Sequence, residues 1–481
     1  MGANIGLPLR AFSLPKFGCF SYRPVEQCLL TLRSFLNSTQ NNPPQLGIWT
    51  LAALVVANMI GAGVFTSSGY SLAALGNPAR VMLAWWLCGV WAICGAIAYG
   101  ALVSRLPLSG GEYLFLSRFC HPSIGFLAGW ISLIAGFTAP IALAAKGAAI
   151  YGAGKQDPLT EQWIAAGVII FATIAYLLGV TFGARIQNAI VAIKLLLLVV
   201  IIVFAFTVAS TTGWQGEVLP GRDPGWIPES FSAWTVLLGS MSWVALSYTG
   251  FNAAVYVAGE AKDAAKSVPR AMLRATLVVT LIYLLLNAAF VYAPAPDLIA
   301  GQEEVAAIVG RAVGGPSFER LVRFTITLAM LTSVFAMLLA GPRVYQKMAE
   351  DGVMPKFFNA DGATPRLATV FQAVLSIIAV FAAELLQLMK YLGLTLSACG
   401  ALAVLSLWWV RKHLPDARPL QWWENLALSI YVLITLAILA ASYETQRAEF
   451  YAMLITFGVG ILFYASWSWM PFTRIKSKHS R

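Results

Sequence analysis

The sequence predicts an all-α integral membrane protein with twelve transmembrane helices, and three observations support this fold class. The chain of 481 residues is 59% hydrophobic and only 11% charged, with a mean hydropathy of +0.74, whereas soluble domains carry about 25% charged residues. Apolar segments of the roughly 20 residues that a spanning helix needs recur along the chain. Two of these segments are interrupted by glycine and polar residues at matching places.

Twelve apolar segments are expected to form the spanning helices. They lie roughly at 46–74, 80–104, 122–152, 161–180, 185–210, 232–258, 268–293, 320–346, 367–386, 390–411, 424–443 and 448–470. The loops between them are short, so one membrane domain accounts for residues 46–470. Residues 1–45 hold no sustained apolar run that would indicate a secretory signal. We expect residues 1–45 and 471–481 to be cytoplasmic tails.

The basic residues predict the orientation. With the N-terminus in the cytoplasm, cytoplasmic segments hold 22 of the 32 Lys and Arg residues, in keeping with the positive-inside bias. The same bias accounts for the formal net charge of +11, so no nucleic-acid partner is expected. We expect both termini in the cytoplasm and the chain in the plasma (inner) membrane, with the lipid bilayer as its surroundings.

The first interruption covers residues 58–69, inside the first apolar segment. Gly61 and Gly63 weaken the helix here, because Gly costs roughly 1 kcal/mol relative to Ala in a helix interior. Open backbone is tolerated at membrane depth only where it is buried in protein or faces a watery cavity. We therefore expect the N–H and C=O groups of this break to hold a small polar ligand, as in many secondary transporters.

A second interruption lies five helices later, at Ser247-Tyr248-Thr249-Gly250-Phe251-Asn252. Two broken helices at matching places predict a midplane site between inverted repeats, here about 46–210 and 232–411, with the helices of 424–470 outside the repeat. Tyr248 and Asn252 have polar groups that can reach a ligand, and packing roles for both are an equal alternative.

Lys194 stands in the run Val191-Ala192-Ile193-Lys194-Leu195. It lies nine residues after Arg185, which places it about 14 Å along the helix, near the middle of a roughly 30 Å core. A cation at that depth should face a polar interior and find a partner; the alternative is a lysine that snorkels to a helix end. We expect it to exchange a proton or to act as a fixed cation in place of sodium.

Three further polar residues lie within apolar segments. The hydroxyls of Thr332 and Ser333 are expected to meet Lys194 or the first break, and bonding back to their own helix is an equally good alternative. Lys146 is expected to snorkel to the outer interface; the alternative is a charge that draws anionic substrates.

The sequence holds little that could support enzyme chemistry. There is no Walker A motif, no Ser-His-Asp pattern and no zinc motif, and the three histidines lie near or beyond helix ends. We expect no enzyme activity, no cofactor and no metal. The six cysteines are expected to be unpaired small apolar residues: Cys19, Cys28, Cys88, Cys94, Cys120 and Cys399.

Several motifs in one order resemble the amino acid–polyamine–organocation (APC) superfamily, close to its L-type amino acid transporter branch. The resemblance runs from about residue 47 to 470. It rests on Gly61-Ala62-Gly63-Val64-Phe65, Leu106-Pro107-Leu108-Ser109-Gly110-Gly111-Glu112-Tyr113, Arg185-Ile186-Gln187-Asn188 with Lys194-Leu195, Tyr248-Thr249-Gly250-Phe251-Asn252 with Glu260, Val268-Pro269-Arg270, Pro342-Arg343 and Asp351-Gly352-Val353-Met354-Pro355.

The resemblance implies a LeuT-like fold, a 5+5 inverted repeat with helices 1 and 6 broken, and alternating access. It places an amino acid carboxylate on the N–H groups of Ala62 and Gly63, at the positive end of a half-helix. The resemblance places the ammonium on the carbonyls of Met59, Leu246 and Thr249. The full expected substrate site is Met59, Gly61, Ala62, Gly63, Leu246, Thr249 and Asn252. Lys194 matches the lysine that occupies the place of a sodium ion in related carriers, with Ser333 and Thr332 as expected coupling neighbours. Those carriers are proton-coupled or sodium-independent exchangers.

Two departures from the family pattern matter. Leu246 stands where the family often has Phe or Trp as a gate, so gating is expected to involve Leu246 or to shift to Trp243, Tyr248 or Phe251. Eukaryotic L-type members use a cysteine after helix 3 to bind a glycoprotein partner, and residues 152–161 contain none. No disulfide-linked heavy chain is therefore expected.

The expected function is secondary transport of amino acids, without ATP. A polyamine or other organic amine is the alternative substrate, but it lacks the carboxylate that the first break is built to receive, and no acidic cluster lies within the membrane segments. A transporter-like nutrient sensor is a second alternative, although the short tails leave little room for a regulatory domain.

Overall fold

The computed structural model describes residues 46–154, 156–178, 184–350, 354–355, 358 and 366–468. Within these residues the chain is helical apart from loops and one isolated bridge between Leu46 and Ala261. The expected tails, residues 1–45 and 471–481, lie outside the described residues, as do Asp351-Gly352-Val353. The all-α prediction is confirmed.

The helices follow the expected order along the chain. They are α2 (Ile48–Met59), α3 (Gly63–Leu75), α4 (Pro78–Arg105), α5 (Gly111–Phe119), α6 (Pro122–Ile131), the π-helix η1 (Ser132–Thr138), α7 (Ala139–Ala153), α8 (Pro158–Leu177), α9 (Ala184–Thr212), α10 (Phe231–Tyr248), the 3-10 helix η2 (Ala253–Glu260), α11 (Ala264–Tyr292), α12 (Pro296–Ile299), α13 (Val305–Glu350), α14 (Arg366–Ala382), α15 (Leu385–Leu405), the 3-10 helix η4 (Ser406–Trp409), α16 (Val410–His413), α17 (Trp422–Thr445) and α18 (Arg447–Ser468).

Most of the expected spans appear as long apolar helices. Among the described residues, nine helices are long and apolar enough to cross a membrane, and ten if α2 and α3 form one bent span. The other two expected spans contain α14, an apolar helix of 17 residues, and α10, which stops after 18 residues at the second interruption. The chain is thus a helical membrane protein, and twelve spans stay a prediction.

Local sequence signals set many of the helix ends. Pro occupies the first turn of α4, α6 and α8, where no N–H is needed. Asn77 caps α4 by accepting the N–H of Ala79, and Asp157 caps α8 by accepting the N–H of Thr160. These bonds from Thr160 hold the pKa of the exposed Asp157 carboxyl below its usual range. At the other end of α3, Gly76 takes the left-handed conformation that terminates a helix.

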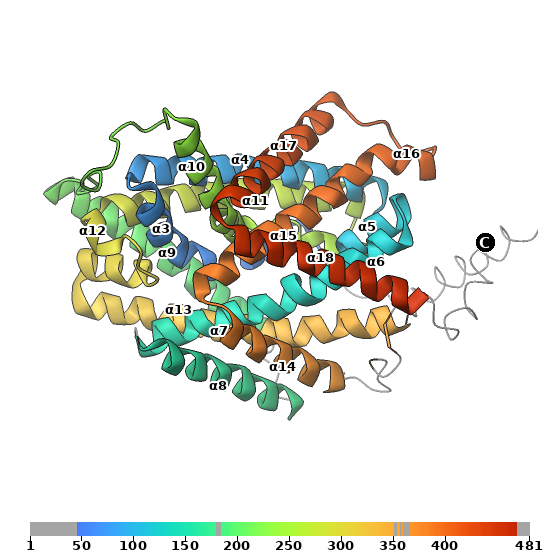
Figure 1. Ribbon diagram of the computed structural model, residues 1–481, viewed down its shortest axis with the longest axis horizontal. Helices are drawn as coiled ribbons and strands as arrows, with labels where there is room; N and C mark the ends of the chain where they lie inside the picture. The colour runs from blue at the N-terminus through green and yellow to red at the C-terminus, as the bar shows by residue number, and fades with distance from the viewer. Residues whose placement is uncertain are drawn as a thin grey trace, which may run out of the picture. The chain divides into compact units, whose positions relative to one another are not determined.

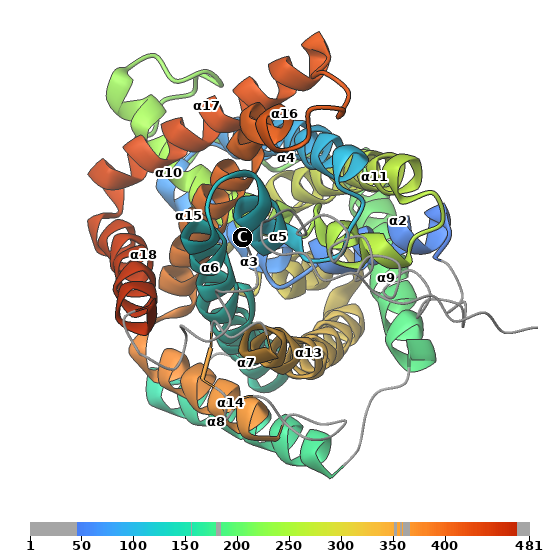
Figure 2. The same ribbon diagram turned by 90° about the vertical axis from the view of Figure 1, so that its right-hand side faces the viewer.

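The packing places α3 and α10 inside a ring of other helices. α10 contacts α3, α4, α15 and α17, and α11 runs along α4 and α2. α7 lies between α8 and α13, with α14 beside α8 (Figures 1 and 2). The two interrupted helices are therefore central, whereas α8 and α14 lie at an edge.

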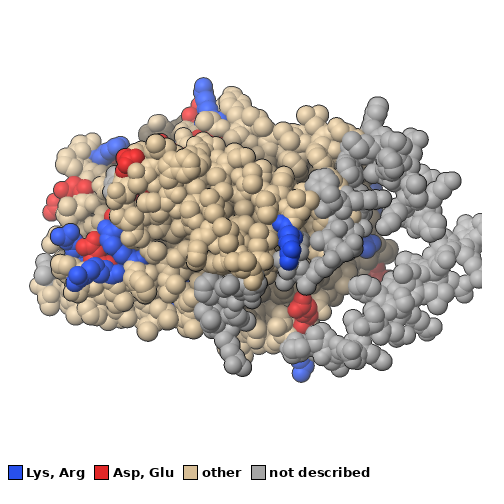
Figure 3. Space-filling model, turned by 90° about the horizontal axis from the view of Figure 1, so that it is seen from below, with Lys and Arg blue, Asp and Glu red and all other residues tan. Residues whose placement is uncertain are grey.

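The outer helices present apolar side chains. α14 exposes Leu367, Val374 and Ile378, and α18 exposes Ile455 and Leu462. Figure 3 shows a broad uncharged surface, with charged side chains gathered mainly toward one end. This distribution is typical of helices that face lipid.

Candidate functional site

The first expected break is present. α2 ends at Met59, α3 begins at Gly63, and the two helices are bent by 43°. Ile60 leaves helical geometry with ψ of 83°. Because the first N–H groups of a helix have no partner within it, the turn at Ala62 and Gly63 presents donors at the positive end of α3.

The second expected break is also present. α10 ends at Tyr248, Thr249 is extended with ψ of 150°, and Gly250 has φ of 98°. Helical structure resumes only as a 3-10 helix at Ala253. Only glycine adopts the Gly250 conformation at little cost.

The two breaks are in direct contact, which explains two of their glycines. A Cβ atom on Gly63 would lie 2.5 Å from the Ser247 hydroxyl oxygen, and one on Gly250 would lie 2.8 Å from the carbonyl carbon of Asn58. Each break thus packs its glycine against the backbone or hydroxyl of the other. A Cβ atom on Gly61 would meet no described atom within 4 Å, so open space adjoins the first break at that residue.

Tyr283 of α11 links the breaks through their carbonyls, and sequence reasoning missed it. Its hydroxyl oxygen lies 2.7 Å from the Met59 carbonyl oxygen and 3.0 Å from that of Ser247, and the side chain is fully buried. One hydroxyl proton can serve either carbonyl, both of which the broken helices leave without a regular partner. A tyrosine within an apolar stretch of α11 was the signal available in the sequence.

Polar groups of α3, the helix after the first break, are hydrogen-bonded to neighbouring helices. The Tyr151 hydroxyl of α7 donates to the Phe65 carbonyl at 2.9 Å, and Ser68 donates to the Asn287 side chain of α11. Ser67 lies 3.2 Å from Ser247, hydroxyl to hydroxyl. These contacts satisfy polar groups that would otherwise be costly in an apolar interior.

Lys194 reaches the first break. Its side chain is 6% exposed, and its ammonium donates to the carbonyl oxygen of Ile60. No carboxylate pairs with it among the described residues. The ammonium therefore contacts the backbone of the break. The snorkelling alternative does not describe this side chain.

Thr332 and Ser333 lie on α13, and no hydrogen bond from the Lys194 ammonium to either hydroxyl oxygen is found among the described residues. Both hydroxyls donate to the Ala329 carbonyl at 2.9 Å, which is the back-bonding alternative. Their lone pairs remain able to accept a hydrogen bond, so their part in coupling stays a prediction.

The carbonyls expected to receive an ammonium are partly engaged. The Met59 carbonyl accepts from Tyr283 and from the Gly61 N–H at 2.9 Å. The Leu246 carbonyl accepts the Thr249 N–H at 3.1 Å and its hydroxyl at 2.6 Å. A ligand ammonium at these oxygens would share or replace internal donors.

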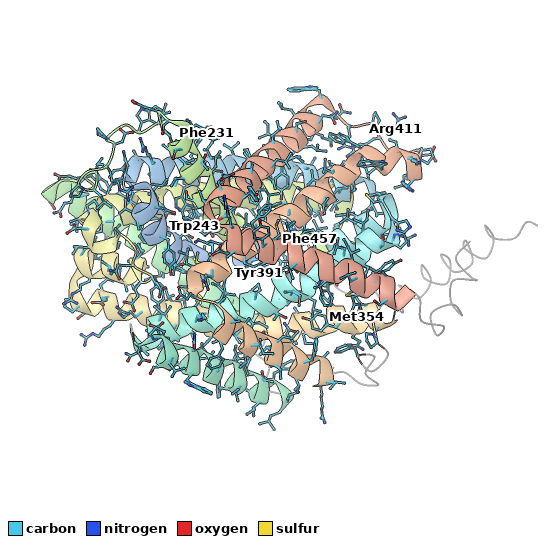
Figure 4. All side chains as sticks on the ribbon, viewed as in Figure 1. Phe231, Trp243, Met354, Tyr391, Arg411 and Phe457 are labelled. Carbon is cyan, nitrogen blue, oxygen red and sulfur yellow. The ribbon has the colours of Figure 1, made fainter. Side chains whose placement is uncertain are left out.

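The four candidate gate residues point in different directions. The Trp243 indole donates to Ser71 of α3 at 2.9 Å, and the Lys390 ammonium lies 5.8 Å from its ring centre. Figure 4 shows Trp243 toward the middle of the helices. Leu246 is 9% exposed. Trp243 and Leu246 lie on the α10 segment that packs against α3.

The other two gate candidates pack against α4. The Tyr248 hydroxyl donates to the Trp85 carbonyl at 3.0 Å, and Phe251 makes edge contacts with Trp91 and Tyr99. Both side chains are buried. Their positions fit the packing alternative, and a gating role for them stays a prediction.

Asn252 donates to Glu112, a residue to which the sequence analysis gave no role. Its amide lies 2.6 Å from one carboxylate oxygen; Tyr99 lies 2.8 Å from the same oxygen and Tyr256 lies 2.5 Å from the other. Gly111 takes a positive φ beside the Tyr256 ring. The buried Glu112 carboxylate on α5 thus accepts hydrogen bonds from Asn252 and Tyr256 and connects α5 to the segment after the second break. The available signal in the sequence was an acidic residue, Glu112, directly after two glycines in a chain with few charged residues.

Lys146 is buried on α7, and no hydrogen bond or ion pair of its ammonium is found within the described ranges. No group of three or more His, Cys, Asp or Glu side chains able to hold a metal occurs in the described part of the chain.

Comparison with known proteins gives one family. The sequence profile of the amino acid permease family matches residues 46–465. Solute carrier family 7 member 12 of Mus musculus is 25% identical over 414 residues, which cover 83% of this chain and 88% of that protein. The serine/threonine exchanger SteT of Bacillus subtilis (strain 168) is 25% identical over 349 residues, covering 69% and 76%. The b(0,+)-type amino acid transporter 1 of Mus musculus is 23% identical over 435 residues, covering 87% of each.

Proposed function

Because this chain belongs to the amino acid permease family of the APC superfamily, we propose that it is a secondary transporter that moves amino acids across a membrane by alternating access. The observation that carries the proposal is the contact between two broken helices. Gly63 packs against Ser247 and Gly250 against Asn58, with open space beside Gly61. Backbone groups from two broken helices converge there, and a zwitterion could share or replace the internal donors that several of their carbonyls now hold.

The amino acid carboxylate binds the N–H groups of Ala62 and Gly63, at the start of α3. Its ammonium binds near the carbonyls of Met59, Leu246 and Thr249, and displaces or shares the internal donors that they hold. The side chain lies toward Leu246. Leu there leaves more room than an aromatic residue would, so the pocket admits a bulkier side chain.

The fold that we propose has twelve spans and two inverted five-helix repeats, with α2–α3 and α10–η2 as the equivalent broken helices. The matching breaks support it. Alternating access then consists of one repeat moving against the other around the contact between the breaks. We propose further that both termini lie in the cytoplasm of a cell whose plasma membrane holds the protein.

Transport is independent of sodium and coupled to protons or to exchange. The Lys194 ammonium on the Ile60 carbonyl supports this coupling, because it supplies a fixed positive charge at the break. A lysine can also release and rebind a proton, whereas a sodium ion has no proton to exchange. Thr332 and Ser333 are the neighbouring acceptors in this proposal.

The transporter works without a disulfide-linked heavy subunit. Residues 152–161, between α7 and α8, contain no cysteine. An amino acid is favoured over a polyamine because a polyamine has no carboxylate for the Ala62 and Gly63 donors.

A binding screen followed by a flux measurement tests the proposal. Purified protein is screened by thermal shift against all amino acids and common polyamines, and each stabilising compound is then followed in proteoliposomes at two pH values, with and without sodium. We expect stabilisation and uptake of amino acids without sodium. Stabilisation by polyamines alone would overturn the substrate class, and binding without flux or exchange would favour a sensor.

A further inference from the structure

A cavity lies away from the two breaks, where α4, α16 and the loop before α17 meet. Its volume is about 260 Å³, and it is lined by Arg105, Leu407, Trp408, Val410, Arg411, Arg418, Pro419 and Leu420. Three arginines and no acidic side chain form its polar lining. The remaining lining is apolar.

Buried ion pairs build one wall of this cavity. Glu424 of α17 is fully buried; Arg105 lies 2.7 Å from it, and Arg418 donates to it as well. The Arg105 guanidinium also donates to the carbonyls of Ala101, Arg418 and Pro419, at 2.7, 3.1 and 3.0 Å. These bonds hold the Arg105 guanidinium in the wall of the cavity, so it is not counted as a donor to a ligand. Glu424 offsets one of the three positive charges.

Arg411 supplies a positive charge at the same cavity that pairs with no other described residue. It is exposed at the end of α16 (Figure 4), and its guanidinium makes no hydrogen bond or ion pair within the described residues. Arg418 is half exposed and reaches Glu424 and Ser104 through one nitrogen. Two guanidinium groups can thus donate to an anion that enters the cavity.

Exposed tryptophans occur in the cavity lining and in the chain segments next to it, and they indicate a membrane–water interface. Trp408, which lines it, is 56% exposed, and Trp409 is 45% exposed. Trp422 and Trp423 are exposed at the start of α17. Tryptophans gather at the level of lipid headgroups, where one part of the ring is apolar and the N–H is wet.

We propose that this cavity binds the phosphate of an acidic phospholipid headgroup. Arginine matches phosphate with paired, charge-assisted hydrogen bonds, and basic pockets beside membrane helices recognise anionic headgroups. A zwitterionic substrate does not fit this lining, because no carboxylate is present to receive its ammonium. The volume is below the roughly 300–1,000 Å³ of pockets for drug-sized ligands, and an open cavity of this size accommodates a headgroup whose acyl chains remain outside.

Matched variants of the full-length protein test the site. Arg411→Gln and Trp408→Ala change lining residues. Lys412→Gln and Trp409→Ala make the same changes at neighbouring exposed residues that do not line the cavity. Binding is measured by native mass spectrometry and by thermal shift with phosphatidylglycerol, phosphatidylcholine, or inorganic phosphate at equal concentration.

Phosphatidylglycerol should bind and stabilise the wild type more than phosphatidylcholine does. Arg411→Gln should weaken phosphatidylglycerol binding about tenfold through loss of paired bonds to phosphate, whereas Lys412→Gln should weaken it no more than about fivefold through the general surface charge. Trp408→Ala should weaken it more than Trp409→Ala. Equal effects within either pair would overturn the site, and equal stabilisation by inorganic phosphate would overturn the lipid as its ligand.

Discussion

Gly63 and Gly61 stand two residues apart but meet different surroundings, and this contrast separates packing from ligand binding. A Cβ atom on Gly63 meets Ser247, whereas one on Gly61 enters open space. Because the proposed carboxylate site includes the Gly63 N–H, a side chain at position 63 would crowd the carboxylate. The structure adds that any side chain there first collides with α10.

Gly63→Ala should lower the stability of the protein by about 1–3 kcal/mol, the usual cost of overpacking, measured as a lower melting temperature in detergent. Adding Ser247→Ala should restore at least part of that loss, because it removes the hydroxyl 2.5 Å away. Gly61→Ala should keep the melting temperature but weaken amino acid binding. A stable Gly63→Ala variant with wild-type affinity would contradict the contact and the proposed site together.

Lys194 is the charged residue that bonds to the backbone of the first break among the described contacts. Lys194→Ala should abolish uptake or its dependence on pH, because the Ile60 carbonyl loses its cation. The measurement is uptake into proteoliposomes at two pH values, with the melting temperature as evidence of folding. Lys146→Ala is the matched control, since Lys146 is also buried in a membrane helix. Unchanged pH-dependent uptake in Lys194→Ala would remove the coupling role.

At the scale of elements, Glu112 of α5 holds η2 through Asn252 and Tyr256 and holds α4 through Tyr99. Glu112→Gln should loosen η2, because a neutral amide offers one acceptor oxygen to three donors. Hydrogen exchange of residues 253–260 should speed up roughly 5- to 150-fold, which corresponds to the loss of about 1–3 kcal/mol when hydrogen bonds to a charged group are broken.

Glu260→Gln is the control for this change, since it removes an exposed charge from the same 3-10 helix. It should leave the exchange of residues 253–260 close to wild type. Slow exchange retained in Glu112→Gln would mean that apolar packing, not the carboxylate, holds η2 in place.

The elements themselves were largely predictable from the sequence, because their signals are local. Runs of apolar residues gave the helices, and Gly61, Gly63 and Gly250 marked the two breaks. The expected span at 320–346 lies within the part of α13 that follows Gly315, where the backbone is non-helical with φ of 72°. The helical segment from Val305 to this kink is shorter than the roughly 20 residues of a span, so its composition does not mark it as one.

Partners across the fold were not predictable. Asn252 is 140 residues from Glu112 in the chain, and Tyr283 is 224 from Met59. A polar group in an apolar helix signals that it needs a partner, but only the packing of helices decides which one. For this reason Asn252 was assigned to the substrate site from sequence, while the structure directs its amide to Glu112.

At the scale of the whole molecule, the orientation rests on the asymmetry of basic residues. If the N-terminus is cytoplasmic and there are twelve spans, the loop between α7 and α8 lies outside and the loop between α16 and α17 lies inside. The cavity at Arg411 is then on the cytoplasmic side. An even number of spans also returns the C-terminus to the cytoplasm.

Labelling of single cysteines tests this topology in intact cells. In a variant lacking Cys19, Cys28 and Cys120, Gln156→Cys should react with a membrane-impermeant maleimide, because Gln156 is exposed in an outer loop, whereas Asp416→Cys should react only after the cells are permeabilised. The remaining described cysteines are buried and give a low background. Labelling of both positions from outside would require an even number of spans between them and would break the proposed repeat, whereas the reverse pattern would invert the protein in the membrane and move the Arg411 cavity to the outer leaflet.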